Sequence, residues 1–175
     1  MFPSDVAKAE VRTIAEGLCI TPRDVGFLLM VLVKPGNFNE GEVLYKYHLQ
    51  KLLFYLWKDL EKSGFSDSLP RDEFIPAENG PKPEHLDEDL KKFEDEKLII
   101  TKCEKWKEGV SKRIILTKEG LDLAQKLWEN LPEPYKVVAM KVKEKIYPLD
   151  PETVRHKVHK EYPEYRDSYI KNDIE

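Results

Sequence analysis

The stretch PEHLDEDLKKFEDEKLIITKCEKWKEGVSKRIILTKEG, residues 83–120, decides the fold that the sequence predicts. Apolar side chains recur at helical spacing near its start, at Leu86, Leu90 and Phe93. The letters LII that follow begin a strand, Gly109 is expected in a turn, and residues 114–116 form the returning strand. Thr117 is a candidate N-cap for the next helix. We therefore expect a helix, a two-stranded hairpin and a second helix, in that order.

Upstream lies TPRDVGFLLMVLV, residues 21–33. Thr21 is a suitable N-cap, Pro22 fits the first helical position, and Asp24 favours the positive end of the helix dipole. The run that follows is apolar on every side, which is typical of a helix in the middle of a core. A buried strand is the alternative, because three valines lie in the run. The capping residues favour the helix.

The clearest helical pattern covers residues 44–64, with Gly64 at its end. Its leucines follow i, i+3, i+4 spacing, at Leu49, Leu52, Leu53, Leu56 and Leu60. Aromatic residues widen the apolar stripe beyond one face, at Tyr47, Phe54, Tyr55 and Trp57. Either the helix is enclosed in the core, or its second face contacts another molecule. A homodimer through Tyr47, Phe54 and the terminal helices is one form of the second interpretation.

The other segments complete a mainly helical chain. Four prolines and Gly80 predict an irregular insertion over residues 65–83, and start signals at Pro134 and Asp150 predict two C-terminal helices. We expect a mainly α fold with a small β-hairpin, in which residues 21–132 form a winged helix-turn-helix core that includes the insertion. Residues 1–20 would add an N-terminal helix, and residues 133–175 a C-terminal helical extension.

Composition limits the class of protein. The chain has 175 residues and a net charge of −4, so it does not attract nucleic acid through its overall charge. Its two cysteines, Cys19 and Cys103, are predicted to be reduced and mostly buried. No secretion signal opens the chain, the longest apolar run (25–33) is too short to cross a bilayer, and a cytoplasmic location is expected. Abundant lysine and glutamate beside two glutamines is typical of heat-adapted proteins.

The helix predicted over residues 84–97 has the position of a DNA-reading helix, yet it is acidic. It contains seven acids and three lysines, a net charge of −4. In a major groove these charges would lie within a Debye length (about 10 Å at 0.1 M salt) of many phosphates. It also offers no arginine, asparagine or glutamine to read bases. We predict that it does not read DNA and is instead a candidate surface for a basic protein, through Glu84, Asp87, Glu88, Lys91 and Asp95.

The hairpin has the opposite charge. Residues 102–113 contain five basic and two acidic residues, a net charge of +3. A basic ribbon with an aromatic residue can follow the DNA backbone or enter a minor groove. The candidate DNA-binding residues are Lys102, Lys105, Trp106, Lys107, Lys112 and Arg113. The alternative is an exposed hairpin whose lysines prevent unwanted edge pairing.

No pattern indicates catalysis, and no cofactor is expected. The sequence has no glycine-rich phosphate loop, no G-x-S-x-G serine and no Cys–His arrangement. His156 and His159 share a helical face, but no acidic or cysteine ligand accompanies them at matching spacing, so no metal site is expected. A hydrolase or nuclease whose residues meet only in the fold stays an alternative.

Four segments resemble a group of prokaryotic winged-helix proteins: YHLQKLLFYL (47–56), NGPKPEHLDEDLKKFEDEKLI (79–99), LTKEG (116–120) and YPEY (162–165). The hallmarks of that group are an L-Q-K-L-L-F helix, a G-P before an acidic helix, and L-T-x-x-G after the wing. The antitoxin-like Panacea domains share the first two hallmarks. The resemblance implies a winged-helix fold and a small regulator or binding partner rather than an enzyme.

Two functions are consistent with these expectations, because a fold alone does not fix a function. The first is a non-catalytic regulator that binds double-stranded DNA through its basic wing. The second is an antitoxin-like interaction module that meets a basic protein through residues 84–97.

Overall fold

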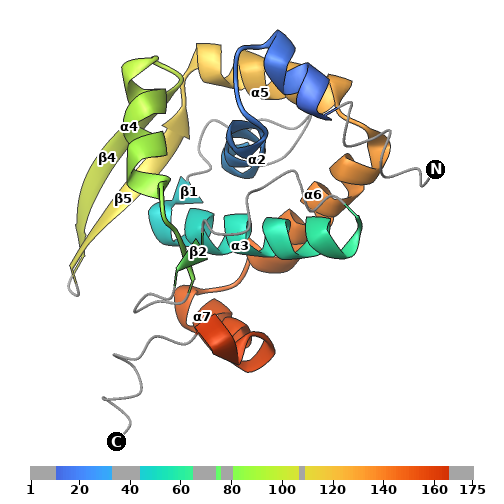
Figure 1. Cartoon of the computed structure of the whole chain (residues 1–175). Coiled ribbons are helices and arrows are strands. Elements are labelled where there is room, and N and C mark those ends of the chain that lie inside the picture. The colour runs from blue at the N-terminus through green and yellow to red at the C-terminus, as the bar shows by residue number, and fades with distance from the viewer. Residues whose placement is uncertain (1–10, 33–43, 65–73, 76–80, 107–108, 166–175) are drawn as a thin grey trace, which may run out of the picture.

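The computed structural model describes residues 11–32, 44–64, 74–75, 81–106 and 109–165. These residues form a mainly helical molecule with a small antiparallel sheet along one side (Figure 1). A helical segment at residues 11–17 comes first. The later elements are α2 (Pro22–Val31), β1 (Leu44–Tyr45), α3 (Lys46–Lys62), β2 (Phe74–Ile75), β3 (Lys82–Pro83), α4 (Leu86–Asp95), β4 (Ile99–Trp106), β5 (Gly109–Leu116), α5 (Lys118–Asn130), α6 (Glu133–Ile146), α7 (Pro151–Glu161) and the short 3₁₀ helix η3 (Pro163–Tyr165).

Helix α2 runs through the middle of the molecule, between α3 and α5 (Figure 1). Its start is a capping box: the Thr21 hydroxyl accepts from the Asp24 backbone N–H, and the Asp24 carboxylate accepts from the Thr21 N–H, both at 3.1 Å. From Asp24 to its last residue the helix is buried. The helix predicted here in preference to a strand is confirmed, because caps at its start combine with an apolar surface on all sides.

Helix α3 is enclosed by the same chain. Its leucines are buried, and so are Phe54, Tyr55 and Trp57 on its second face. The helix ends at Ser63, and Gly64 follows with a φ of 85°, the left-handed conformation that glycine adopts at low cost. The core interpretation of this aromatic face therefore holds for these three residues, while Tyr47 is half-buried and stacks on Tyr45.

The sheet has the strand order β1–β5–β4. The hairpin of β4 and β5 is confirmed and runs in register from the Ile99–Leu116 pair to the Trp106–Gly109 pair. The turn predicted at Gly109 is wrong by a residue or two, since Gly109 already pairs with Trp106 as the first residue of β5. Strand β1, which the sequence did not predict, adds to the outer edge of β5 through Leu44–Ile114 and Tyr45–Arg113.

The close packing where α4, the hairpin and α5 meet explains why the last residue of LTKEG, Gly120, is a glycine. The Thr117 hydroxyl donates to the Lys97 carbonyl at 2.7 Å and accepts from the Gly120 N–H at 3.0 Å, so the predicted N-cap is confirmed. A Cβ atom on Gly120 would lie 1.9 Å from the Leu98 carbonyl oxygen. Only glycine lets the first turn of α5 approach the backbone at the start of the hairpin this closely.

The insertion predicted over residues 65–83 is not wholly irregular. Strands β2 and β3 pair within it, Phe74 opposite Pro83, while residues 65–73 and 76–80 lie outside the described part. The Phe74 ring is buried and stacks on Trp57, with a centroid distance of 5.0 Å. One buried aromatic residue therefore anchors this pair of strands to α3, which sequence periodicity could not indicate for a two-residue strand.

The C-terminal helices were predicted at both of their starts. Helix α6 begins at Glu133, one residue before Pro134, and buries Val138, Val142 and Ile146. Asp150 caps α7, where its carboxylate accepts from the Thr153 N–H at 2.8 Å. These helices share one hydrophobic cluster with α2 and α3, and the domain boundaries drawn from the sequence stay a prediction.

The YPEY residues close the C-terminal end of the described chain against α3. Tyr162 and Tyr165 both meet the Phe54 ring edge-on, at centroid distances of 5.1 and 5.0 Å. The Lys58 ammonium lies 4.3 Å from the Trp57 centroid and within 5.5 Å of both tyrosine rings. Edge-to-face packing and a shared cation hold η3 in place.

The cysteines and the hydrophobicity of the helices were also predicted from the sequence. Cys19 and Cys103 are free thiols, as predicted, but both are exposed, so the prediction that they are mostly buried is wrong. Cys19 follows the break after residue 17 with a φ of 58°, and Cys103 lies on the distal half of β4 beyond the core. Across the described ranges, every helix is too short or too polar to pass through a membrane.

Candidate nucleic-acid interface and the acidic helix

The hairpin carries its predicted DNA-binding residues on both faces. Alternation along the strands puts Lys102 and Arg113 opposite each other on one face, whereas Lys105 and Lys112 belong to the face that includes Ile99 and Ile114 at its base. Those two isoleucines are buried, but the distal part of the same face is exposed. The set therefore occupies both faces of the middle and distal part of the hairpin instead of forming a single flat patch.

Arg113 is already held by an acid. Its guanidinium donates to the Glu104 carboxylate at 2.5 Å, and the Tyr45 hydroxyl donates to the other oxygen of Glu104 at 3.1 Å. Burial, and then the bond to Glu104, raise the pKa of Tyr45 above its ordinary value. Strand β1 thus supplies a third member to this cluster, and the cluster neutralises Arg113 and fixes the middle of the hairpin.

Three of the predicted basic residues keep exposed ammonium groups on the hairpin: Lys102, Lys105 and Lys112. Lys107 lies outside the described residues, and Trp106 is described only by its backbone pairing with Gly109. At the base of β4, the Thr101 N–H and hydroxyl both donate to the Glu94 carboxylate of α4. The hairpin is therefore anchored at its base and charged towards its free end.

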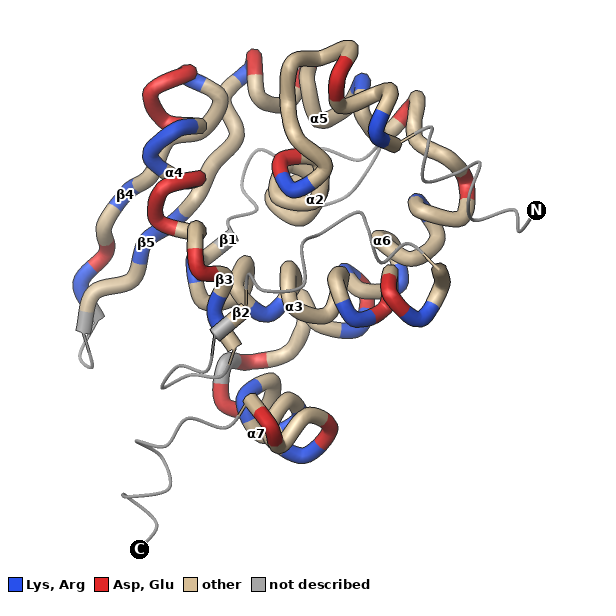
Figure 2. The backbone as a smooth tube through the Cα atoms, in the orientation of Figure 1, with Lys and Arg blue, Asp and Glu red and all other residues tan. Residues whose placement is uncertain are grey.

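The outward face of α4 carries the predicted partner-binding residues, and all five are exposed: Glu84, Asp87, Glu88, Lys91 and Asp95. Figure 2 shows acidic positions along this helix beside the hairpin. Asp87 is partly neutralised, because Lys46 and Lys82 lie 2.5 and 3.3 Å from its two carboxylate oxygens. The bond to Lys46 is the largest cause that lowers the pKa of Asp87.

The inward face of α4 is tied to α2 by two ion pairs. Arg23 donates to Asp89 at 3.0 Å, and Lys92 donates to Asp24 at 2.7 Å, where Asp24 is 0% exposed. Burial raises the pKa of Asp89 above its usual value, against the opposing effect of Arg23. The Phe27 and Phe93 rings stack between these helices at 4.5 Å. The partners stand more than 60 positions apart, so no local pattern could have paired them.

These inward pairs change how the charge of the helix is distributed but not its sum. Asp89 and Lys92 cancel each other, which leaves six acids and two lysines over residues 84–97 on the outside, a net charge of −4. The electrostatic objection to placing this helix in a DNA groove therefore survives folding.

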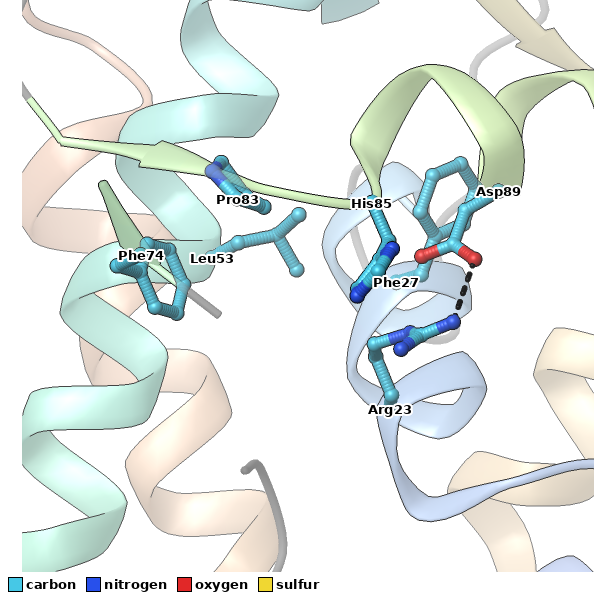
Figure 3. Close-up of a pocket in the computed structure, with 7 residues that line it drawn as sticks. All are labelled: Arg23, Phe27, Leu53, Phe74, Pro83, His85 and Asp89. Atoms are coloured by element: carbon cyan, nitrogen blue, oxygen red, sulfur yellow. Dashed lines mark hydrogen bonds and ion pairs between the residues drawn. The ribbon is translucent and has the colours of Figure 1, made fainter. Parts of the chain in front are cut away.

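A small pocket lies beside these ion pairs, between α2, α3 and the start of α4 (Figure 3). Arg23, His85 and Asp89 supply its polar wall, and Phe27, Leu53, Phe74 and Pro83 supply its apolar wall. Its volume of about 10 Å³ is enough for roughly one water molecule. It is a packing defect of the ionic cluster and not a ligand pocket.

His156 and His159 do not converge with other ligands. The His156 Nε2 atom lies 3.7 Å from the Glu152 carboxylate on the same helix. No group of three or more histidine, cysteine or carboxylate side chains is arranged to hold a metal ion in the described part of the chain.

Comparison of the chain with models of protein families, with curated proteins and with solved structures found no match.

Proposed function

We propose that α2, α3, α4 and the three-stranded sheet form a winged helix-turn-helix core, and that the protein is a non-catalytic regulator that binds DNA through the wing. The order α2–β1–α3–β2–β3–α4–β4–β5, with β1 at the outer edge of β5 and β2–β3 as an insertion, supports the winged-helix interpretation. The motif resemblance to prokaryotic winged-helix proteins agrees with it and stays a prediction.

The distribution of charge favours the wing over α4 as the DNA contact. A hairpin with three exposed lysines can place ammonium groups beside phosphates, and such contacts do not depend on the base sequence. The outer face of α4 would repel the same backbone. We therefore expect contact with the phosphate backbone and weak sequence preference, with α4 turned away from the duplex.

The observation that carries the proposal is the exposure of Lys102, Lys105 and Lys112 along the middle and distal part of a hairpin whose base is bonded to α4. Three phosphate contacts predict a salt dependence of about −2.7 in log K against log salt, since each contact on duplex DNA contributes about −0.9.

Titration of labelled duplex DNA at several salt concentrations tests this number. Replacing the three wing lysines by alanine should remove most of the slope. The matched control replaces three exposed lysines elsewhere, at Lys118, Lys126 and Lys160, and should retain it. Equal slopes in the two triple variants, or no binding of the wild type at low salt, would contradict DNA binding by the wing.

A second candidate function is binding of a basic protein by α4. It is favoured by one observation: the exposed residues of segment 84–97 sum to a net charge of −4, of which Lys46 and Lys82 offset part at Asp87, while the inner face of α4 is paired with α2. Nuclear magnetic resonance titration with an oligolysine peptide should shift amides of α4 and leave those of β4 unchanged. Charge reversal at Glu84, Glu88 and Asp95 should abolish these shifts, and shifts that persist would exclude the surface.

The expected homodimer also stays a proposal, but its surface changes. Phe54 is fully buried within one chain, so it cannot form the contact that the sequence indicated. Large apolar side chains that do remain exposed in the described residues are Ile100, Val110 and Val137. Sedimentation equilibrium of the full chain measures the association directly.

A further inference from the structure

Lys51 of α3 is a cation inside the protein. Lys51 as a whole is 3% exposed, and its Nζ atom is buried with no hydrogen-bond acceptor among the described residues. Lysine usually extends its ammonium group to water even where its carbon chain is buried. A buried ammonium without an acceptor loses its hydration and gains nothing in exchange.

The position of Lys51 is fixed by contacts on either side of it. One turn earlier on α3, a ring nitrogen of His48 (Nε2) lies 3.0 Å from the Leu149 carbonyl, just before α7. One turn later, the Tyr55 hydroxyl donates to Glu161 at 3.1 Å, at the end of α7. Helices α3 and α7 therefore run in the same direction, and Lys51 faces the middle of α7.

The charged residue at the middle of α7 is a second cation. Arg155 is half-buried, and its Nε atom is buried and has no hydrogen-bond acceptor within the described chain. Helix α7 has two carboxylates. That of Glu152 lies 3.7 Å from the His156 Nε2 atom, and that of Glu161 is bound to Tyr55 and to Lys157 at 2.5 Å. Two positively charged side chains thus face one interface, close enough for Arg155 to act electrostatically on Lys51, and neither has a carboxylate partner among the described residues.

Loss of the proton from Lys51 does not remove the problem at neutral pH. Burial first, and repulsion from Arg155 second, lower the pKa of Lys51 to about 8. At pH 7 about nine-tenths of the molecules therefore still carry the ammonium charge. The interface retains two positive charges that lack an acceptor among the described residues, and a bound anion would supply one.

We propose that the interface of α3 and α7 binds a small tetrahedral oxyanion, of the phosphate or sulfate class, between the Lys51 ammonium and the Arg155 guanidinium. Lysine supplies a point charge at the buried end, and the planar guanidinium supplies paired donors at the half-buried end, where the anion enters. The site is independent of the wing, on which the DNA proposal depends.

Thermal denaturation of the full chain tests the proposal with inorganic phosphate as the probe. Phosphate should raise the midpoint by about 5–10 °C at a concentration 100 times the dissociation constant. Chloride at equal ionic strength, and acetate as a planar carboxylate, should raise it much less. Calorimetric titration then measures a dissociation constant and a stoichiometry of one.

Two variants separate the site from a general salt effect. Lys51→Met replaces the lysine by an apolar side chain of similar length, so the variant should fold. It should nevertheless weaken phosphate binding by more than about 30-fold. Arg155→Gln should weaken it in the same direction while leaving Lys51 in place. Lys160→Met removes an exposed charge of α7 and should leave the binding constant unchanged.

A phosphate-dependent shift that disappears in Lys51→Met and persists in Lys160→Met supports the site. An equal shift in all variants indicates an adventitious ion only and overturns the proposal. The proposal is also overturned if phosphate, at a 50-fold or greater molar excess over the wild-type protein, raises the denaturation midpoint no more than chloride does.

Discussion

Lys51 should make the protein more stable at pH 9.5 than at pH 7 in buffers that lack an oxyanion. Its pKa falls from 10.5 to about 8 on folding, so the unfolded chain holds more protons between these two values. The free energy of unfolding must then rise with pH across that window. The penalty is complete below pH 8 and vanishes above the unfolded pKa.

The size of the effect can be worked from the shift. A difference of about 2.5 pKa units corresponds to about 3 kcal/mol, since each unit is worth about 1.4 kcal/mol. Lys51 is only 3% exposed, so solvent screens little of this cost. At pH 7 the free energy of unfolding of Lys51→Met should therefore exceed that of the wild type by about 2–3 kcal/mol. This difference should shrink towards pH 9.5.

Urea denaturation measures both numbers, because urea adds no ions that could occupy the site. The range must stop near pH 9.5: burial raises the pKa values of Tyr55 and Tyr135, so their ionisation in the unfolded chain lowers stability near pH 10 and above. Lys160→Met is the control with equal loss of charge. A flat wild-type profile from pH 7 to 9.5, or a Lys51→Met protein less stable than the wild type at pH 7, would refute the reasoning.

Three further substitutions test the packing that positions the two surfaces. Gly120→Ala should destabilise the fold by about 3 kcal/mol in urea denaturation, because its Cβ would overlap the Leu98 carbonyl; wild-type stability would show that α5 can shift freely. Gly17→Ala meets no atom within 4 Å and should be neutral or stabilise by up to about 1 kcal/mol. Asp24→Asn should cost about 3 kcal/mol, since it leaves the Lys92 ammonium beside a neutral amide; an unchanged urea midpoint would mean that this pair contributes nothing.

Local signals were sufficient for most elements of this protein. Thr21, Thr117 and Asp150 each cap the helix that the sequence assigned to them, because a cap needs only a side-chain oxygen and a backbone N–H three residues later. The hairpin was equally predictable, since its strands are adjacent in sequence. Strands β1, β2 and β3 were missed because two residues carry no measurable periodicity.

The candidate surfaces were predicted less completely. The sign of the charge on α4 and on the hairpin follows from the residues of each segment, and the exposure of Lys102, Lys105 and Lys112 agrees with it. It could not show that Glu104 and Tyr45 hold Arg113, because register brings these three side chains together. Nor could it show that both cysteines are exposed.

What the sequence alone determined is the order of the elements, their caps and the net charge of each segment, all of which depend on residues within a few positions of one another. Tertiary structure alone decided which charges meet. Asp24 pairs with Lys92 and Arg23 with Asp89, and Lys51 experiences the charge of Arg155, although the members of each pair stand 66 to 104 positions apart. The physical reason is that burial removes water from a charge, and only the packed fold determines whether a partner replaces that water.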